Sequence, residues 1–139
     1  MIYPLEAGQG LDPWDDAQTI AGRLAQPGAE LLVVLGAEAW CQRCKGMRPG
    51  FEALRAAHAP AHAVWLWLDL EDHAEFLGDF LPEDLPMLLR WQAGVCVQAA
   101  VLESINLATT PAVRSREVEL PAAPPEIWAA LTQKGWAGS

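Results

Sequence analysis

Two patterns of apolar residues alternate along the first half of the chain. Apolar positions three and four residues apart predict an amphipathic helix over residues 12–26. The continuous apolar run from Glu30 to Leu35 predicts a short strand buried on both faces, which favours a central parallel strand. The two patterns then repeat, as a helix from Cys41 to His58 that Pro49 should kink and a second buried strand over residues 63–68.

The second half of the chain predicts shorter elements. A short acidic helix is expected over residues 71–77, and strands over 85–91 and 95–101 should form an antiparallel hairpin around a tight turn that includes Gly94. A last helix is expected over residues 124–131, with one apolar face. This order of elements indicates an α/β fold: a central mixed sheet with helices on both of its faces.

One segment gives no firm pattern. Residues 103–123 lack a helical or strand period, so we expect an irregular or extended loop there. The chain of 139 residues, 52% of them hydrophobic, is long enough for one core, and a single domain over residues 1–139 with an N-terminal extension over 1–11 is the expectation.

Charge and hydropathy narrow the classes of partner. Nine basic against 18 acidic residues give a formal net charge of −9, which disfavours nucleic acid and anionic lipid surfaces as partners. No apolar run approaches the roughly 18 residues of a membrane helix. The N-terminus lacks the basic and apolar regions of a secretory signal, so we expect a cytoplasmic monomer; a signal already removed would leave the same N-terminus.

The cysteines carry the candidate chemistry. Cys41 and Cys44 stand two residues apart, between a predicted buried strand and the start of a helix. The amide groups and positive dipole end of that helix favour a thiolate on Cys41, and Arg43 adds a nearby cation. Cys44, one helical turn on, can attack a mixed disulfide formed by Cys41. Cys41 is therefore the candidate nucleophile and Cys44 the candidate resolving thiol.

Other interpretations of the cysteines remain open. The pair could be two buried structural thiols, and Arg43 could be only a surface charge. A zinc site needs two further ligands at suitable spacing, and Cys96 with His58, His62 and His73 forms no recognisable zinc pattern, so we expect no metal. Cys96 lies in an apolar strand and is interpreted as an inert core residue.

The run Trp40-Cys41-Gln42-Arg43-Cys44-Lys45, with Pro49 five residues after the second cysteine, resembles the signature of the thioredoxin family. Leu85-Pro86 resembles the family's cis-proline element. The resemblance covers residues 12–101 and the last helix. It implies a thioredoxin-like fold in which Trp40, Leu85 and Pro86 help to hold an extended substrate segment, and it implies a cis peptide bond before Pro86.

The sequence also departs from the family. The usual Gly-Pro between the cysteines is Gln42-Arg43 here, and both residues are expected to tune the redox properties of the pair. The buried Asp and the Lys that assist proton transfer in typical thioredoxins correspond to Leu35 and Trp65. Glu38 is the acid nearest to Cys41 in the sequence and could substitute for that Asp or simply be solvated.

Two functions follow from these observations. The first is a protein disulfide oxidoreductase that exchanges disulfides with protein disulfide or dithiol substrates, without a metal or organic cofactor and with an unidentified electron donor or acceptor. The second is a thioredoxin-like binding or assembly-chaperone module with little catalytic turnover. The first function requires a reversible disulfide between Cys41 and Cys44, with Cys96 free.

Overall fold

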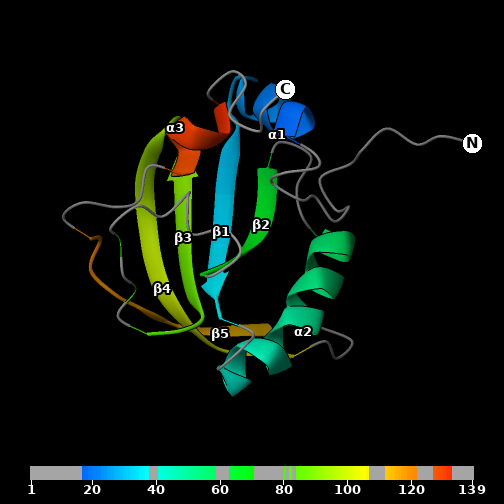
Figure 1. Cartoon of the computed structure of the whole chain (residues 1–139), viewed down its shortest axis with the longest axis vertical. Helices are drawn as coiled ribbons and strands as arrows, with labels where there is room; N and C mark the ends of the chain where they lie inside the picture. The colour runs from blue at the N-terminus through cyan, green and yellow to red at the C-terminus, as the bar shows by residue number, and fades with distance from the viewer. Residues whose placement is uncertain are drawn as a thin grey trace, which may run out of the picture.

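In the computed structural model, helices pack against a five-stranded sheet (Figure 1). The structure describes residues 17–37, 41–58, 63–70, 80, 82, 84–106, 112–121 and 127–132. Its elements, in chain order, are α1 (Ala17–Leu24), β1 (Glu30–Gly36), α2 (Gln42–His58), β2 (Ala63–Asp69), β3 (Met87–Gln92), β4 (Val95–Asn106), β5 (Ala112–Glu117) and α3 (Ile127–Thr132).

The sheet is mixed, as the sequence predicts. Its strand order is β2-β1-β3-β4-β5. β1 and β2 are parallel, whereas β3 pairs antiparallel with β1 and with β4, and β5 pairs antiparallel with β4. The helix α2 connects the two parallel strands, as a parallel pair requires. The fold is therefore the predicted α/β type, with the thioredoxin-like arrangement of a mixed sheet between helices.

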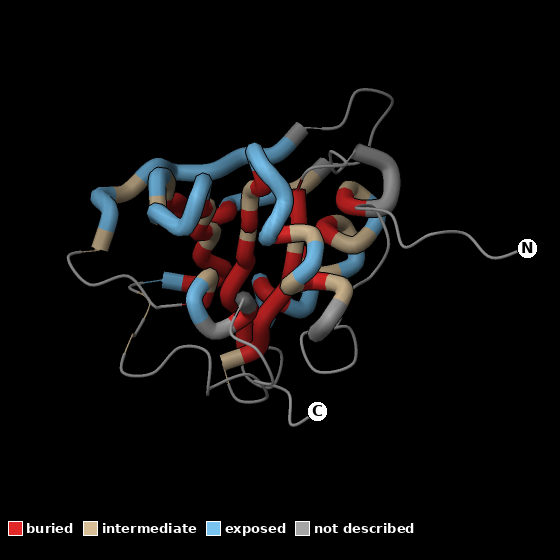
Figure 2. The backbone as a smooth tube through the Cα atoms, turned by 90° about the horizontal axis from the view of Figure 1, so that it is seen from above, coloured by how far each residue is buried: buried red, intermediate tan, exposed pale blue. Residues whose placement is uncertain are grey.

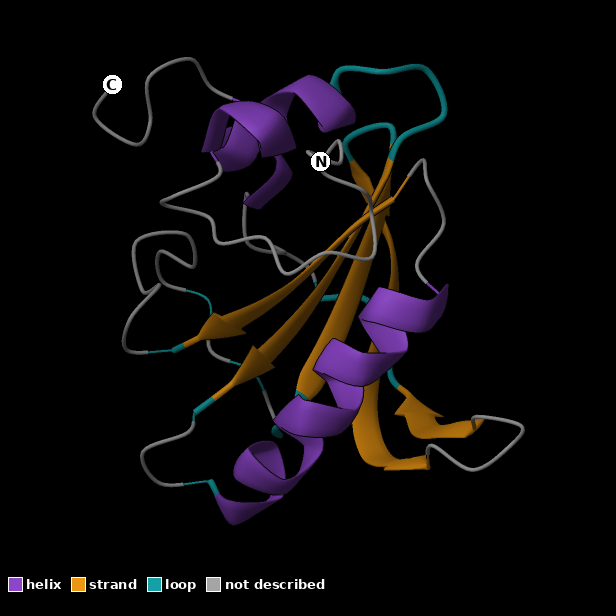
Figure 3. Cartoon of the chain, turned by 90° about the vertical axis from the view of Figure 1, so that its right-hand side faces the viewer, coloured by secondary structure: helices purple, strands orange, loops and turns teal. Residues whose placement is uncertain are grey.

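One face of the sheet carries a large aliphatic cluster. Because side chains alternate along a strand, Leu31, Val33 and Leu35 of β1 point to the same face. They pack with Ile20 of α1 and Ile127 of α3, all of them buried. α1 and α3 lie side by side on this α1/α3 face, apart from α2 (Figure 3). In Figure 2 the buried strands run through the middle of the molecule, and the exposed segments surround them.

The other face, the α2 face, carries a smaller and more mixed cluster. Val34 of β1 packs there with Met47 and Phe51 of α2 and with Trp67 of β2. The buried thiol of Cys44 belongs to the same cluster. The candidate chemistry therefore lies on the α2 face.

The prediction for residues 103–123 is wrong in part. β4 continues to Asn106, and residues 112–117 form the edge strand β5, so these two stretches form a hairpin instead of a loop. Every described side chain of β5 is exposed, which explains why no apolar period marks the strand. In Figure 1, β5 lies at the end of the molecule where α2 begins.

The other predicted elements agree with the structure where it describes them. Pro49 lies inside α2. Ala93 and Gly94 form the predicted turn between β3 and β4, with φ angles of 51° and 82°. The predicted helix over 71–77 and the start of the helix over 12–26 lie outside the described residues.

Candidate functional site

The topology brings three segments to one edge of the sheet. The parallel strands β1 and β2 both end there, and α2 begins just after this edge. β3 runs antiparallel to β1, with Met87 opposite Leu35, so residues 84–86 enter the sheet at the same edge. Val101 of β4 lies opposite Met87, and Arg116 of β5 lies opposite Val101. Residues distant in sequence therefore meet beside the cysteine pair.

Cys41 caps the N-terminus of α2. Its amide donates a hydrogen bond to the carbonyl of Ala37 over 2.8 Å, and its carbonyl accepts one from the amide of Lys45 over 3.1 Å. The amide of Cys44 donates to the sulfur of Cys41 over 3.2 Å. The sulfur thus takes the place of an N-cap side-chain oxygen and receives one of the amides that a helix start leaves unpaired.

The two thiols differ in exposure. Cys41 is half-buried, whereas Cys44, in the first turn of α2, is fully buried against the sheet. Burial, together with the neighbouring Cys41, raises the pKa of the Cys44 thiol to about 12. Cys44 is therefore protonated at neutral pH. Both cysteines are free thiols in this structure.

The third cysteine lies on the other side of the sheet. Cys96 is half-buried on β4 and packs against the aliphatic cluster of the α1/α3 face. Burial raises the pKa of its thiol as well. Its place agrees with the interpretation of Cys96 as part of the core. No group of three or more metal-binding side chains occurs within the described ranges.

The segment before β3 lies against the start of α2. The peptide bond between Leu85 and Pro86 is cis, and both residues are buried. The amide of Leu85 donates to Oδ1 of Asp84 over 2.8 Å, and its carbonyl accepts a hydrogen bond from Nη1 of Arg43 over 3.4 Å. Both backbone groups of Leu85 therefore have partners within the protein.

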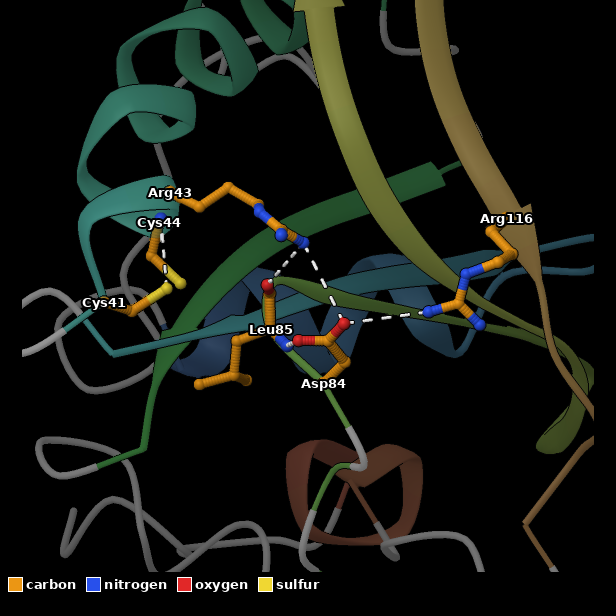
Figure 4. Close-up of polar contacts among 6 residues, drawn as sticks. All are labelled: Cys41, Arg43, Cys44, Asp84, Leu85 and Arg116. Carbon is orange, nitrogen blue, oxygen red and sulfur yellow. Dashed lines mark hydrogen bonds and ion pairs between the residues drawn. The ribbon is translucent and has the colours of Figure 1, made fainter.

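Asp84 connects three parts of the site. Its Oδ2 lies 3.9 Å from Nη1 of Arg43 on α2 and 3.7 Å from Nη2 of Arg116 on β5. Figure 4 shows the two arginines reaching Asp84 from opposite sides, with the cysteines beyond Arg43. The side chains of Arg43, Asp84 and Arg116 are 50%, 48% and 55% exposed, so all three groups are accessible to solvent and to ligands.

Aromatic packing holds the strand that leads into the site. A β-carbon added at Gly36 would lie 2.5 Å from Cζ2 of Trp67, so the indole packs directly on the glycine backbone. Phe51 of α2 covers Trp67, with ring centroids 5.7 Å apart, and the guanidinium of Arg48 lies 5.9 Å from the indole ring. Gly36 therefore allows α2 to lie close to the sheet immediately before the cysteines.

The structure brings together part of the predicted site. Cys41 caps α2; Gln42, Arg43 and Cys44 lie in its first turn, and Leu85 and Pro86 lie beside them. Trp40 and Glu38 lie outside the described residues. Leu35 points to the α1/α3 face, whereas Trp65 packs against the cluster that holds Cys44.

Sequence reasoning did not identify Asp84 or Arg116. The signal available for Asp84 was its place directly before Leu85-Pro86, where an Asp side chain can bind a nearby backbone amide. Arg116 gave no signal because its strand was not predicted. Asp69 was also missed; it is a buried carboxylate at the end of β2, opposite Gly36.

Comparisons with known proteins add a likeness of fold. No protein-family model matches the sequence, and no curated protein matches it. The alignment with thioredoxin f from spinach chloroplast covers 72% of this chain and 86% of the thioredoxin chain, with 13% sequence identity and a TM-score of 0.52. The alignment with thioredoxin from Trypanosoma brucei brucei covers 73% of this chain and 85% of the thioredoxin chain, with 13% sequence identity and a TM-score of 0.52.

A third solved structure extends this likeness. The alignment with a redox protein from Chlamydomonas reinhardtii covers 73% of this chain and 33% of the redox protein, with 21% sequence identity and a TM-score of 0.53. At these identities the matches establish the fold and not the activity. None of the described helices has the length and apolar character that crossing a bilayer requires.

Proposed function

We propose that this chain, which has a thioredoxin-like fold, is a thiol–disulfide oxidoreductase that acts on protein substrates through Cys41 and Cys44. One observation carries the proposal. Cys41 is half-buried at the start of a 17-residue helix and its sulfur accepts an amide hydrogen bond, while Cys44 is fully buried one turn further on. An accessible sulfur beside a buried one is the arrangement that sequential thiol–disulfide exchange needs.

The proposed reaction has two exchange steps. The Cys41 thiolate attacks a substrate disulfide, forms a mixed disulfide with one substrate sulfur and releases the other as a thiolate. Cys44 then loses its proton and attacks the sulfur of Cys41, which releases the second substrate sulfur. The substrate gains two electrons and two protons, and the protein is left with a Cys41–Cys44 disulfide. An external dithiol returns two electrons and two protons for the next cycle.

The second step depends on the proton of Cys44. Its pKa of about 12 has burial as the largest cause and Cys41 as the next. Once Cys41 is in a mixed disulfide, it no longer accepts a proton or carries a charge, but the burial remains. We therefore expect attack by Cys44 to need a proton acceptor or a local opening of the first turn of α2.

The roles of the neighbouring residues belong to the same proposal. An extended substrate segment would lie along Leu85 and Pro86, beside Trp40. Leu85 could pair with substrate only if Arg43 and Asp84 release its backbone groups, since both groups have these partners in the free protein. Gln42, Arg43 and Glu38 would tune the thiol chemistry. No bound cofactor is needed, because both electrons reside on the two sulfurs.

A binding or assembly module with little turnover is the rival function. Its supporting observations are the high pKa of the buried Cys44 thiol and the leucine at position 35, where typical thioredoxins carry an acid. A module of this kind would use the same exposed edge to hold a partner without exchanging disulfides.

Reduction of an insulin-type disulfide by dithiothreitol, with and without the protein, separates the two functions. Wild type should accelerate the reaction, and Cys41→Ser should lower the rate by about 1,000-fold or more, toward the uncatalysed rate. Cys44→Ser should stop turnover and leave substrate attached to Cys41 as a mixed disulfide visible by mass spectrometry. Cys96→Ser is the matched control and should retain the wild-type rate. Equal rates for wild type and Cys41→Ser would refute the oxidoreductase.

A further inference from the structure

The charges of the protein are unevenly distributed around the cysteine pair. The chain has a net charge of −9, yet residues 42–51, at the start of α2, include three of its nine basic residues and no acidic one. β5 adds Arg114 and Arg116 against one acid, Glu117. Asp84 is the carboxylate that lies between these two segments. Among the described residues, the start of α2 and β5 are therefore locally positive on an acidic protein.

Arg43 and Arg116 share one carboxylate. Each lies within 4 Å of the same oxygen of Asp84, and among the described residues neither arginine has another ionic partner. Two positive charges against one negative charge leave a net positive charge at this point. Each guanidinium carries five N–H donors, and only Nη1 of Arg43 and Nη2 of Arg116 contact Asp84. Several donors therefore remain available for an anion.

These ion pairs contribute little to stability. Their N–O distances are 3.7 Å and 3.9 Å, and all three side chains are about half exposed. Exposed pairs of this kind add little or no measurable stability to a protein. A substrate carboxylate could therefore join or replace Asp84 at low energetic cost, and its ionic hydrogen bonds to two guanidinium groups would be stronger than neutral ones.

We infer that Arg43 and Arg116 bind a carboxylate of the substrate, so that the preferred substrate is a polypeptide disulfide with acidic residues next to the attacked cysteine. This inference rests on the proposed oxidoreductase function. The two arginines flank Asp84 directly before Leu85-Pro86, at the edge where substrate would meet Cys41 (Figure 4). The net negative charge of the remaining surface repels acidic segments and directs them to this positive edge.

A simpler explanation exists for basic residues on β5. Charged side chains on an edge strand prevent unwanted pairing with other chains. That explanation predicts the same effect for substitution of Arg114 and of Arg116, because both are exposed on the same strand. Substrate recognition predicts different effects for the two, because Arg116 contacts Asp84 whereas Arg114 lies two residues earlier on the strand.

The test uses three synthetic peptides with the same internal disulfide and with Glu, Gln or Lys beside one cysteine. We measure kcat/KM for reduction of each peptide by the full chain at low salt. Wild type should prefer the Glu peptide over the Lys peptide by about 10-fold, as two exposed charge pairs predict, and 0.5 M NaCl should reduce that ratio. Arg116→Gln should lower the ratio to about 3-fold, and Arg43→Gln with Arg116→Gln should abolish it.

Two further variants separate recognition from general charge. Arg114→Gln is the matched control and should keep the preference within about 2-fold of wild type, while Arg116→Lys should retain part of it. Equal losses in Arg114→Gln and Arg116→Gln, or a wild type without preference, would overturn the inference and leave the oxidoreductase intact. Failure of wild type to reduce even the Gln peptide would instead refute the proposed function, and the inference with it. Circular dichroism checks that each variant is folded.

Discussion

The two faces of the sheet differ in what they bury. The α1/α3 face holds an aliphatic cluster in which the large side chains, such as Leu31, Leu89 and Ile127, are fully buried. The α2 face holds fewer buried residues, and among them are a thiol and an indole whose Nε1 has no hydrogen-bond partner within the described part of the chain. Near the start of β1 the α2 face becomes polar, where Arg90 of β3 contacts Glu30 and Gln98.

This difference separates stability from chemistry. The α1/α3 face removes mainly aliphatic surface from water, and this burial is the main driving force of folding. The α2 face buries the thiol of Cys44, leaves Cys41 partly exposed and carries Arg43 beside them. Part of its packing therefore positions the groups of the candidate site. Substitutions on the first face should therefore act on stability, and those on the second should act on reactivity as well.

The largest expected effect concerns the aliphatic cluster. Leu89→Ala removes a fully buried side chain from the α1/α3 face and should lower the free energy of unfolding by about 2–5 kcal/mol. Leu88→Ala, one residue earlier on β3 but half-buried on the α2 face, should cost about 1 kcal/mol. Urea unfolding measures both variants. Equal losses would contradict the difference between the faces.

A second change tests the contact between β1 and Trp67. Gly36→Ala places a methyl group 2.5 Å from the indole and should lower the free energy of unfolding by about 1–3 kcal/mol. Gly46→Ala in α2 is the matched control, since a β-carbon there meets no atom within 4 Å, and it should stabilise the protein by about 0.5–1 kcal/mol. If Gly36→Ala is neutral, Trp67 can move and the packing beside the site is looser than described.

The buried thiol predicts a loss of stability in alkaline solution. The pKa of Cys44 is about 12 in the folded protein, above its value of 9.0 in the unfolded chain. As the pH rises, the unfolded chain therefore loses this proton before the folded protein does. The free energy of unfolding keeps its full value below pH 9 and falls as the pH rises from 9 toward 12. At pH 10.5 the loss should be on the order of 1–2 kcal/mol.

Denaturant unfolding from pH 8 to 10.5 measures this loss. Cys44→Ala should show a weaker dependence on pH than wild type. Cys96→Ala is the comparison variant, because burial also raises the pKa of that thiol and it contributes in the same direction. An unchanged pH dependence in Cys44→Ala would show that Cys44 is less buried than the structure has it.

The smallest expected effect lies in the turn between β3 and β4, which belongs to neither face. Ala93 has a φ angle of 51°, a left-handed conformation that costs an alanine more than it costs an asparagine. Ala93→Asn should raise the free energy of unfolding by about 0.5 kcal/mol. Thermal unfolding should show a small increase in the midpoint, with disulfide reduction unchanged. A decrease would mean that the side chain of Ala93 makes a contact that asparagine cannot.

The sequence predicted those parts of the fold that local patterns determine. The runs that became β1 and β2 are apolar on both faces, and the helical period of Met47 and Phe51 identified α2. Local patterns also predicted the turn at Gly94 and the place of Cys41 and Cys44 between β1 and the start of α2, and the structure agrees with both.

The remainder depends on tertiary pairing. β5 is an exposed edge strand formed by residues with no apolar period, and only its hydrogen bonds to β4 define it. The contact of Asp84 with Arg43 and Arg116 joins residues 41 and 32 positions apart in the sequence, so spacing along the chain gives no signal for it. The redox step itself stays a prediction from the positions of the two sulfurs.

Titration of the protein in glutathione buffers of graded potential tests the central claim most directly. Each sample is acid-quenched, its free thiols are alkylated, and the masses of its peptides are measured. We predict one two-electron transition in which Cys41 and Cys44 become linked while Cys96 remains free. A protein whose three thiols all stay free across the range, or one in which Cys96 pairs with Cys41 or Cys44, would contradict the account.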